Sequence, residues 1–560
     1  MVLLACCTHV FSSRMRFSSS FRTAMASPFT VHRLHMRGRS PVVKCLNSIE
    51  TILRRSVGTE PVVAHTEGAQ GDDSGEKDGP RSLSELTADR QEQAEKSVLI
   101  SCPIRTSETK FLKFLSKHGN INKHFFYESY GVYAVVEFAR RESVVSLLES
   151  AAIPSVNHEC IVPFKSRLLS LSNQSLAASP AQQPGLPCQP QTTVSINELI
   201  QRLSTEDSVD DQIGALTEAY QLTEENSRLR FLVCSLLKDV AAAYFPECTI
   251  RPFGSSVNGF GKLGCDLDMF LDLDSISGWN FKPPKSGLSL EYQMKRTNSE
   301  RHVTQSILSV IGECVDHFGP GCVGVQKILN ARCPLVRFAH QPSGFQCDLT
   351  ANNRVAMKST ELLYLYGELD PRKRSPPIIP TLDRLRDLAG PADESVIEGN
   401  DCTFTTDFSK IQLQSNTDTL EQLLGDFFEF YATFPFSRMS INIRKGREQN
   451  KPEVAPLHIQ NPFETSLNVS KNVNTSQLDR FVALCQESAW LLQQGETRTQ
   501  RGSSRNRTAT PWGLATLLLP SKVAGIKGRK KHKKEGASQR IKSLLESLKN
   551  KNEEPKSEDA

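Results

Sequence analysis

Short hydrophobic blocks alternate with charged and polar positions over residues 96–168. Short apolar runs predict strands, and apolar positions three or four residues apart predict helices. In chain order we expect a strand at 97–100, a helix at 108–118, strands at 124–127 and 132–138, a helix at 142–149 and a strand at 160–164. This order of strands and helices is the order of a ferredoxin-like domain.

A second and larger block covers residues 195–492. Leucines recur at helical intervals from Leu229, which predicts a helix at 224–244. A strand should begin at Thr249, and a sharp turn should follow it at Gly254-Ser255. Further strands are expected at 325–329, 334–338 and 345–349. The fold class that these patterns indicate is α+β.

Polar segments separate and flank the two blocks. We expect a flexible linker at 56–95, because this stretch lacks the large apolar groups that a core needs. A second linker is expected at 169–194, which is rich in Ser, Gln and Pro, and a disordered basic tail at 493–560. The first 49 residues contain seven Arg and Lys and no acidic residue, and serine is frequent. This composition predicts a mitochondrial transit peptide over 1–55, with a disordered basic tail as the alternative.

Composition excludes several classes of protein. The chain has 560 residues, and 67 basic against 62 acidic residues give a net charge of +5, too small to indicate a partner. No stretch is apolar enough to cross a bilayer. The 15 cysteines are scattered and none is spaced C-x-x-C, which argues against a zinc finger and against a small disulfide scaffold. We interpret them as reduced thiols.

Three aspartates are the candidate catalytic residues. Asp266 and Asp268 alternate with apolar residues, so on a strand both carboxylates would face one side. Two carboxylates this close repel each other unless divalent cations lie between them, and Mg²⁺ favours carboxylate oxygens together with substrate phosphates. Asp348 lies in a later apolar strand and is the expected third metal ligand. Backbone at Gly254 and the hydroxyl of Ser255 can bind phosphate oxygens.

The spacing of these elements resembles the nucleotidyltransferase superfamily that includes poly(A) polymerases and terminal uridylyltransferases. The resemblance implies a mixed-sheet catalytic domain at 195–370, a polymerase-associated helical domain at 371–492, and a nucleotide-recognition loop at 459–473. It also implies two Mg²⁺ or Mn²⁺ ions and a nucleoside triphosphate as substrate. Further nucleotide contacts are implied at the following positions: Gly264, Cys265 and Ser359, the last standing where relatives supply an asparagine to the ribose.

The block at 96–168 resembles a degenerate RNA-recognition motif. Residues 131–138 are similar to the longer ribonucleoprotein signature, with Tyr133 at one base-stacking position, but Val135 and Leu99 replace the other aromatic rings. We therefore expect protein contact or homodimerisation rather than base recognition. The turn at Tyr127, Glu128 and Ser129 is a further candidate for nucleotide contact, with a solvated turn as the alternative.

The chain departs from the family pattern after Asp370. Relatives carry a long helical segment there, with a basic residue for the triphosphate and a Ser-Tyr pair beneath the base. Here residues 371–374 lead directly into Ser375-Pro376-Pro377. The resemblance therefore implies that these central helices, and with them part of the nucleotide pocket, are missing.

Three functions follow from these observations. The first is template-independent addition of AMP from ATP to the 3′ ends of RNA in the mitochondrial matrix. The second is uridylyl transfer, although the recognition loop contains no histidine, which favours ATP. The third is a catalytically impaired RNA-binding or dimerising protein. The basic run from Lys522 to Lys534 is expected to hold RNA through its phosphates, or else to be a solvated tail.

Overall fold

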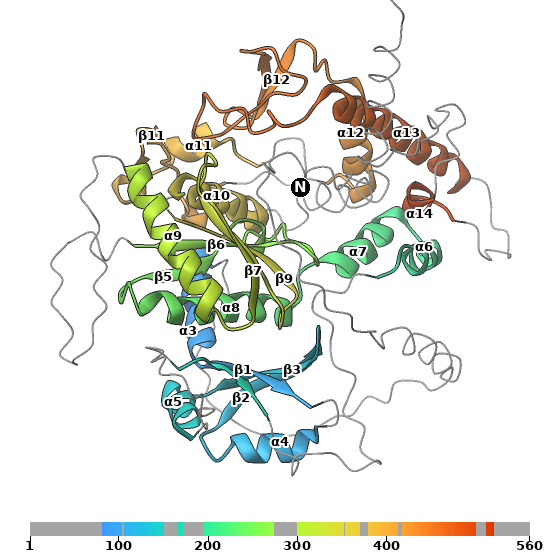
Figure 1. Cartoon of the computed structure of the whole chain (residues 1–560). Coiled ribbons are helices and arrows are strands. Elements are labelled where there is room, and N and C mark those ends of the chain that lie inside the picture. The colour runs from blue at the N-terminus through green and yellow to red at the C-terminus, as the bar shows by residue number, and fades with distance from the viewer. Residues whose placement is uncertain are drawn as a thin grey trace, which may run out of the picture.

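A five-stranded sheet lies at the centre of the molecule (Figure 1). The computed structural model describes residues 81–103, 106–150, 165–171, 194–273, 300–351, 353–369, 379–412, 417–499 and 511–519. The strands of the central sheet, which we call the palm, are β5 (Thr249–Pro252), β6 (Leu267–Asp272), β7 (Cys322–Ile328), β8 (Leu335–His340) and β9 (Phe345–Ala351). Their order across the sheet is β5-β6-β9-β8-β7.

The palm sheet is mixed. β6 and β9 run parallel, and the other neighbouring pairs are antiparallel. Helices α8 (Glu224–Ala242) and α9 (Glu300–Phe318) cover one face and bury the apolar residues of the strands in one continuous core. The predicted α+β fold with a mixed-sheet palm is confirmed, and the predicted elements lie within a few residues of the observed ones.

The N-terminal module has a sheet of its own, with the order β2-β3-β1-β4. Its elements are β1 (Ser97–Cys102), α4 (Glu108–Leu115), β2 (Ile121–Glu128), β3 (Val132–Phe138), α5 (Arg141–Ser150) and β4 (Leu168–Ser170). The strand expected at 160–164 lies outside the described residues. The observed β4 comes later and runs parallel to β1, whereas a ferredoxin-like sheet places its last strand antiparallel to the first.

Helix α3 (Leu83–Glu95) corrects the prediction of a flexible linker over 56–95. Its polar composition hid two local signals that hold it. Ser82 caps the N-terminus and Glu85 completes a capping box, which satisfies the first free backbone donors. Arg90 then makes an ion pair with Glu224 at the start of α8. The helix is therefore anchored to the palm by charge pairs rather than by a large apolar face.

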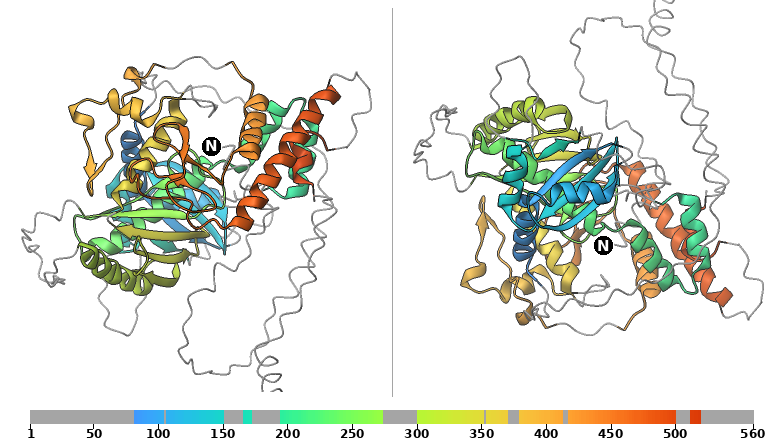
Figure 2. Two further views of the ribbon diagram at one scale, coloured as in Figure 1. Left: turned by 90° about the horizontal axis from the view of Figure 1, so that it is seen from above. Right: turned by 90° about the horizontal axis from the view of Figure 1, so that it is seen from below.

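The remaining helices form two groups. Helices α10 (Arg354–Leu369) and α11 (Leu382–Asp387), both labelled in Figure 1, share one core, and α10 contacts the Gly254 turn of the palm through Thr360. The second group, on one side of the palm in both views of Figure 2, combines α6 (Ile196–Thr205), α7 (Val209–Tyr220), α12 (Leu420–Thr433), α13 (Thr475–Thr499) and α14 (Leu514–Leu518) in one core.

This grouping bears on two expected boundaries. Residues 196–220 were assigned to the catalytic domain, and α6 and α7 of this range share their core with α12, α13 and α14. Helix α14 lies inside the segment that we expected to be disordered, 493–560, and its Leu514 is bound to Gln212 of α7. The segment predicted to be a transit peptide, the link at 370–378 and the basic run from Lys522 lie outside the described residues.

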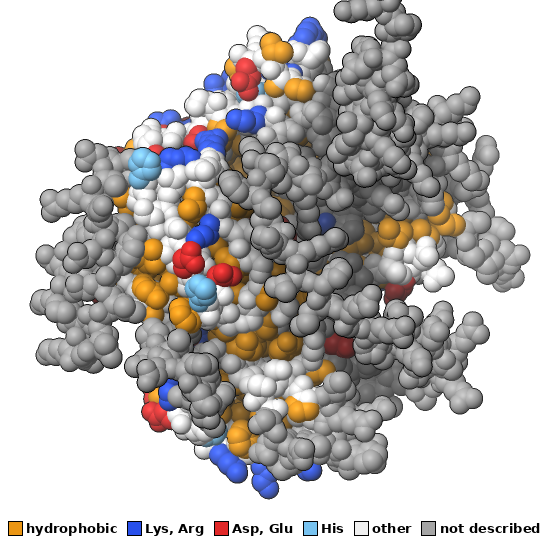
Figure 3. Space-filling model, in the orientation of Figure 1, with side chains coloured by type: hydrophobic (Ala, Val, Ile, Leu, Met, Phe, Trp, Pro, Cys, Tyr) orange, Lys and Arg blue, Asp and Glu red, His pale blue; other side chains and the backbone are white. Residues whose placement is uncertain are grey.

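Two small sheets complete the described structure. One is the hairpin of β10 (Val396–Ile397) and β11 (Asn400–Asp401), and the other has the order β13-β12-β14 from β12 (Met439–Asn442), β13 (Arg447–Asn450) and β14 (Ile459–Gln460). Among the helices that the structure describes, none has the length and apolar character to span a membrane. Figure 3 shows acidic and basic side chains interspersed on the visible face, as the small net charge predicts.

Candidate active site

The palm places two of the three candidate aspartates side by side. Asp268 on β6 lies directly opposite Asp348 on β9 in the parallel register. Side chains alternate along these strands, so Met269 and Leu349 point to the opposite face and are completely buried. Asp266 lies one residue before β6 begins, so the expectation that both aspartates of the pair belong to the strand is wrong for Asp266.

We call Asp266, Asp268 and Asp348 the carboxylate row, and in this row the ionised forms of Asp266 and Asp268 are disfavoured. Burial is the main cause that raises the pKa of Asp268, to about 6, and the charges of Asp348 and Asp266 add to it. The pKa of Asp266 is also raised, first by burial and then by Asp348. A divalent cation would reverse both effects, because it stabilises the charged form of each ligand.

Arg337 on β8 extends the row and was missed by sequence analysis. It faces Asp348 in the antiparallel register, and its Nε and Nη2 donate to the two carboxylate oxygens at 2.7 and 2.5 Å. In the sequence, Arg337 could be noticed only as a charged residue in an expected strand, three positions after Pro334. The residue that it faces depends on the register of the β8–β9 hairpin, which the sequence does not show.

The donor type fits Mg²⁺ or Mn²⁺, since all three candidate ligands are carboxylates. The three carboxylates do not converge on one point where an ion could bind. Within the described ranges, no three His, Cys, Asp or Glu residues converge closely enough to hold an ion. Both oxygens of Asp348 accept a hydrogen bond from Arg337, which leaves only their remaining lone pairs to a metal.

The glycine turn lies directly beside the carboxylates. Gly254 begins a short 3₁₀ turn, Gly254–Ser256, with φ of +63°, a conformation that favours glycine. A Cβ at this position would lie 3.3 Å from Asp268 Oδ2. The backbone N–H of Gly254 donates to Thr360 Oγ1 on α10 at 3.0 Å. The turn therefore places Gly254 beside Asp268, and the role of Ser255 in phosphate binding stays a prediction.

Ser359 lines a cleft that also contains Gly254. The cleft runs between α10 and the loop at 461–467, and its walls include Asn461 and Glu464. Glu464 accepts a hydrogen bond from Arg332 of the palm at 2.6 Å, which joins the loop to the sheet. The structure thus brings together the glycine turn, the position of the ribose contact and the expected recognition loop.

Two other candidates, Gly264 and Cys265, lie in the loop before Asp266. Gly264 has φ of +80°, which lets the chain turn into β6. The carbonyl and Sγ of Cys265 both accept hydrogen bonds from Arg230, a buried residue of α8. The hydrogen bond from the buried Arg230 therefore fixes the position of the Cys265 carbonyl.

The structure does not bring Tyr127, Glu128 and Ser129 into the cleft. Tyr127 is completely buried, and its hydroxyl donates to the Pro342 carbonyl at 2.9 Å. Ser129 Oγ donates to the Gln341 carbonyl at 3.2 Å. The proposed nucleotide contact by the Tyr127 side chain is wrong, because this side chain joins the module to the β8–β9 turn of the palm.

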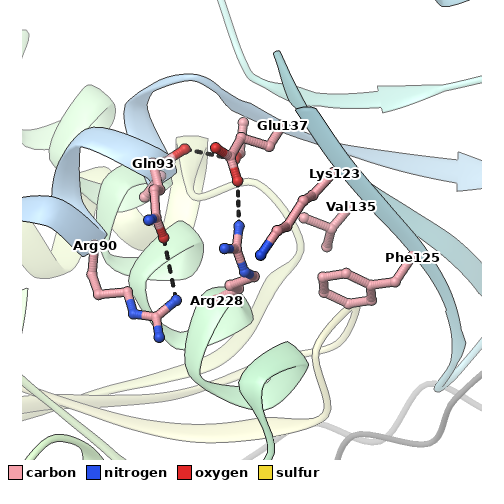
Figure 4. A pocket seen from close by; sticks show the side chains of 9 residues that line it. Arg90, Gln93, Lys123, Phe125, Val135, Glu137 and Arg228 are labelled. Carbon is pink, nitrogen blue, oxygen red and sulfur yellow. Dashed lines mark hydrogen bonds and ion pairs between the residues drawn. The ribbon is translucent and has the colours of Figure 1, made fainter. Parts of the chain in front are cut away.

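The same interface covers the face of the module that would stack bases. Leu99, Tyr127 and Val135 belong to the continuous palm core, and Tyr133 stacks on Tyr127 with ring centroids 5.7 Å apart. At the edge of this interface Arg228 of α8 reaches Glu137 of β3, beside Arg90 of α3, as Figure 4 shows. The sheet face is therefore occupied by the protein itself.

Comparisons with known proteins agree with this geometry. A family model for the central palm domain of mitochondrial-like poly(A) RNA polymerases matches residues 209–368, and an RL-domain model matches 82–152. The chain is 50% identical over 509 residues to mouse "Poly(A) RNA polymerase, mitochondrial", covering 84% of this chain and 86% of the mouse protein. The human protein of the same name is 52% identical over 511 residues, with the same coverage.

The chain belongs to the mitochondrial poly(A) RNA polymerase family. A crystal structure of mtPAP in its apo form matches with a TM-score of 0.69 and 46% identity, covering 79% of this chain and all of that one. A structure of mtPAP in complex with ATPγS matches equally well. A crystal structure of mtPAP in complex with UTP also matches. A bound nucleotide in a crystal structure therefore does not by itself show whether ATP or UTP is the preferred substrate.

The alignment also measures how much of the family sequence is absent. The mouse match is 509 positions long, while 84% of 560 residues is about 470, so about 40 aligned positions have no residue in this chain. This size agrees with the loss of a pair of helices. The length of the match does not place these positions along the chain, so a missing segment after Asp370 stays a prediction.

Proposed function

We propose that this chain is built to transfer AMP from ATP to the 3′ end of RNA in mitochondria. The observation that carries the proposal is the register of Asp268 against Asp348, directly beside the Gly254 turn. The similar proteins are named mitochondrial poly(A) RNA polymerases, and one related crystal structure contains an ATP analogue. Their name agrees with a mitochondrial location, which the composition of the first 49 residues also predicts.

Asp266, Asp268 and Asp348 would hold the divalent ions, either Mg²⁺ or Mn²⁺. Bound there, such ions would neutralise the phosphates and lower the pKa of the RNA 3′ hydroxyl. The protein itself supplies the other requirements. The Gly254 turn and Ser255 bind the triphosphate, the cleft beside Ser359 orients the ribose, and Asp348 is placed to accept the hydroxyl proton once Arg337 has released it.

The missing segment sets the expected level of activity. The three aspartates are present, but residues 371–378 are too few to contain the helices that, in relatives, carry the basic residue and the Ser-Tyr pair around the nucleotide. We therefore propose that this chain keeps its metal site, binds nucleotide weakly and extends RNA slowly. It can act as an impaired form of the polymerase.

A primer-extension assay with ATP and UTP in separate reactions tests the function. Wild type should extend RNA with ATP faster than with UTP, and Asp266→Asn with Asp268→Asn should remove the extension. Asp272→Asn is the matched control, because Asp272 lies on the same strand but pairs with Arg251 outside the row. Preference for UTP would establish the uridylyl alternative, and extension unaffected by the double variant would contradict the proposed site.

Homodimerisation through the module is part of the proposal. Since one face of its sheet is covered by the palm, the surfaces left for a second copy are the helices α4 and α5 and the edge strands β2 and β4. Light scattering of the full chain tests this proposal: a monomer at all accessible concentrations would contradict it. Binding of RNA phosphates by the basic run after Lys522 is proposed as well, and its deletion should reduce the salt dependence of RNA binding.

A further inference from the structure

Arg230 is the largest completely buried side chain among the described residues. It lies on α8, beneath the loop that leads into β6. Burying a guanidinium group costs free energy unless its donors find acceptors. Here Nε donates to Asn226 Oδ1 at 2.7 Å, and the guanidinium carbon lies 4.7 Å from the centre of the Phe345 ring.

The two terminal nitrogens of Arg230 reach two different loops. Nη1 donates to Ser256 Oγ and to the Asp266 carbonyl, both at 2.9 Å. Nη2 donates to the Cys265 carbonyl at 2.9 Å. All of these acceptors are neutral hydroxyl or carbonyl oxygens. The planar guanidinium group therefore holds the glycine turn in a fixed position relative to the backbone of Asp266.

We propose that Arg230 is a positioning residue for the metal site. It fixes the Gly254–Ser256 turn against the backbone of Cys265 and Asp266, and so sets where the phosphate-binding turn lies relative to the first carboxylate. The inference rests on the proposed function, because it assigns a role to Arg230 only if the aspartates bind divalent cations. Arg230 itself is too deeply buried to touch the substrate.

A second buried arginine provides a matched control. Arg167 is 5% exposed, and its guanidinium also makes several hydrogen bonds, to Asp239, Ser235 and the carbonyls of Ala94 and Ser97. These bonds join the module to α8 and do not reach the loops of the carboxylate row. Arg167→Lys should therefore destabilise the protein without changing the metal site.

The experiment compares Arg230→Lys and Arg167→Lys in the full chain. Both retain the charge and lose the planar fork. Mn²⁺ affinity is measured by electron paramagnetic resonance without nucleotide, and folding is measured by circular dichroism. Arg230→Lys should weaken Mn²⁺ binding about tenfold or more, as loss of supporting contacts around metal ligands does. Arg167→Lys should stay within about twofold of wild type, since it lowers only thermal stability.

The outcomes separate this inference from the proposed function. If wild type does not bind Mn²⁺, the proposed function is wrong. If wild type binds and folded Arg230→Lys binds equally well, or if both variants lose affinity equally, the positioning role is wrong. Should Arg230→Lys fail to fold, Ser256→Ala decides, because it removes one acceptor and should weaken Mn²⁺ binding by a smaller factor. Unchanged affinity in folded Ser256→Ala would overturn the inference.

Discussion

The palm has one continuous apolar core, whereas the helical part of the chain is divided among several cores. In the palm, residues from the module, α8, α9 and the five strands form one continuous apolar core. The helical part has three separate cores among the described residues: one around α10 and α11, one around α6, α7 and α12–α14, and one where α12 and α13 meet β12. In Figure 2 the α12–α14 group stands apart from the palm.

This difference in packing affects metal binding by the aspartates and nucleotide binding in the cleft in different ways. The carboxylate row depends on strand register, which the continuous palm core fixes. The nucleotide cleft depends on how α10, α11 and the recognition loop are held together, and fewer contacts determine that. Arg444 supplies some of them, since it bonds to Asp383 on α11 and to the Pro462 carbonyl in the loop. We therefore expect metal binding to be retained better than catalysis.

Restoring the missing helices gives the largest expected effect. A chain with the corresponding segment of the mouse relative inserted between Asp370 and Ser375 should extend RNA with ATP at least about a thousandfold faster, or about 4 kcal/mol in activation free energy. Loss of one transition-state donor alone costs 10² to 10³ in rate, and the segment supplies several contacts. Single-turnover extension measures the change. Equal rates would mean that the remaining cleft is sufficient.

Core truncations should distinguish the two regions by how the chain unfolds. Leu349→Ala in the palm core and Leu424→Ala in the α12 core remove equally buried side chains, and each should cost about 2–5 kcal/mol locally. With separate cores, Leu424→Ala should move only the transition of the helical group, and Leu349→Ala only that of the palm. Differential scanning calorimetry of the full chain measures both. A single transition moved by either variant would show that the two regions unfold together.

Asp268→Asn should bind metal more weakly and yet be more stable. The folded pKa of Asp268 is about 6 against 3.8 for the free side chain, so the folded protein binds the proton more tightly than the unfolded chain. Stability of the metal-free chain is therefore lost as pH rises from about 4 to 6, and stays lower at pH 7.5. Removing this charge should add about 1–3 kcal/mol at pH 7.5.

Thermal unfolding in chelator at pH 4 and pH 7.5 checks this sign. The gain from Asp268→Asn should be present at pH 7.5 and largely absent at pH 4, which lies below the folded pKa of about 6 and close to the unfolded pKa of 3.8. Asp272→Asn is the control, because Asp272 is paired with Arg251. A variant that is less stable than wild type at pH 7.5 would contradict the interpretation that the charge of Asp268 destabilises the folded protein when no metal is bound.

Sequence predicted the parts of the molecule that depend on local pattern. The strands of the palm, the alternation at Asp268 and the turn at Gly254 follow from apolar periodicity and from glycine, so the main site could be assembled before the structure. The expected family and the α+β fold are confirmed by the relatives and by the palm. Helix α3 was missed because capping and ion pairs stabilise it, and these leave little apolar signal.

Contacts between distant segments could not be predicted. Arg337 meets Asp348 only through the β8–β9 register, and Arg230 reaches Cys265 across 35 positions. The assignment of Tyr127 to nucleotide contact failed for the same reason: the position looks like a surface turn in sequence, and only the docking of the module on the palm buries it. α6 and α7 likewise joined the helical group through tertiary packing with α12 and α14.

Tyr127→Phe gives the smallest expected effect and tests whether the module belongs to the palm. The substitution removes the hydroxyl that donates to the Pro342 carbonyl and leaves a buried acceptor unpaired, which should cost about 1–2 kcal/mol. Tyr130→Phe is the matched control, because Tyr130 is 80% exposed and should change stability by less than about 0.5 kcal/mol. Urea unfolding measures both, and filter binding measures RNA and ATP affinity in the same preparations. Because the stacking face of the module is covered, neither variant should alter these affinities. A stable Tyr127→Phe protein with weakened ATP or RNA binding would instead show that the module opens from the palm and that Tyr127 contacts the substrate.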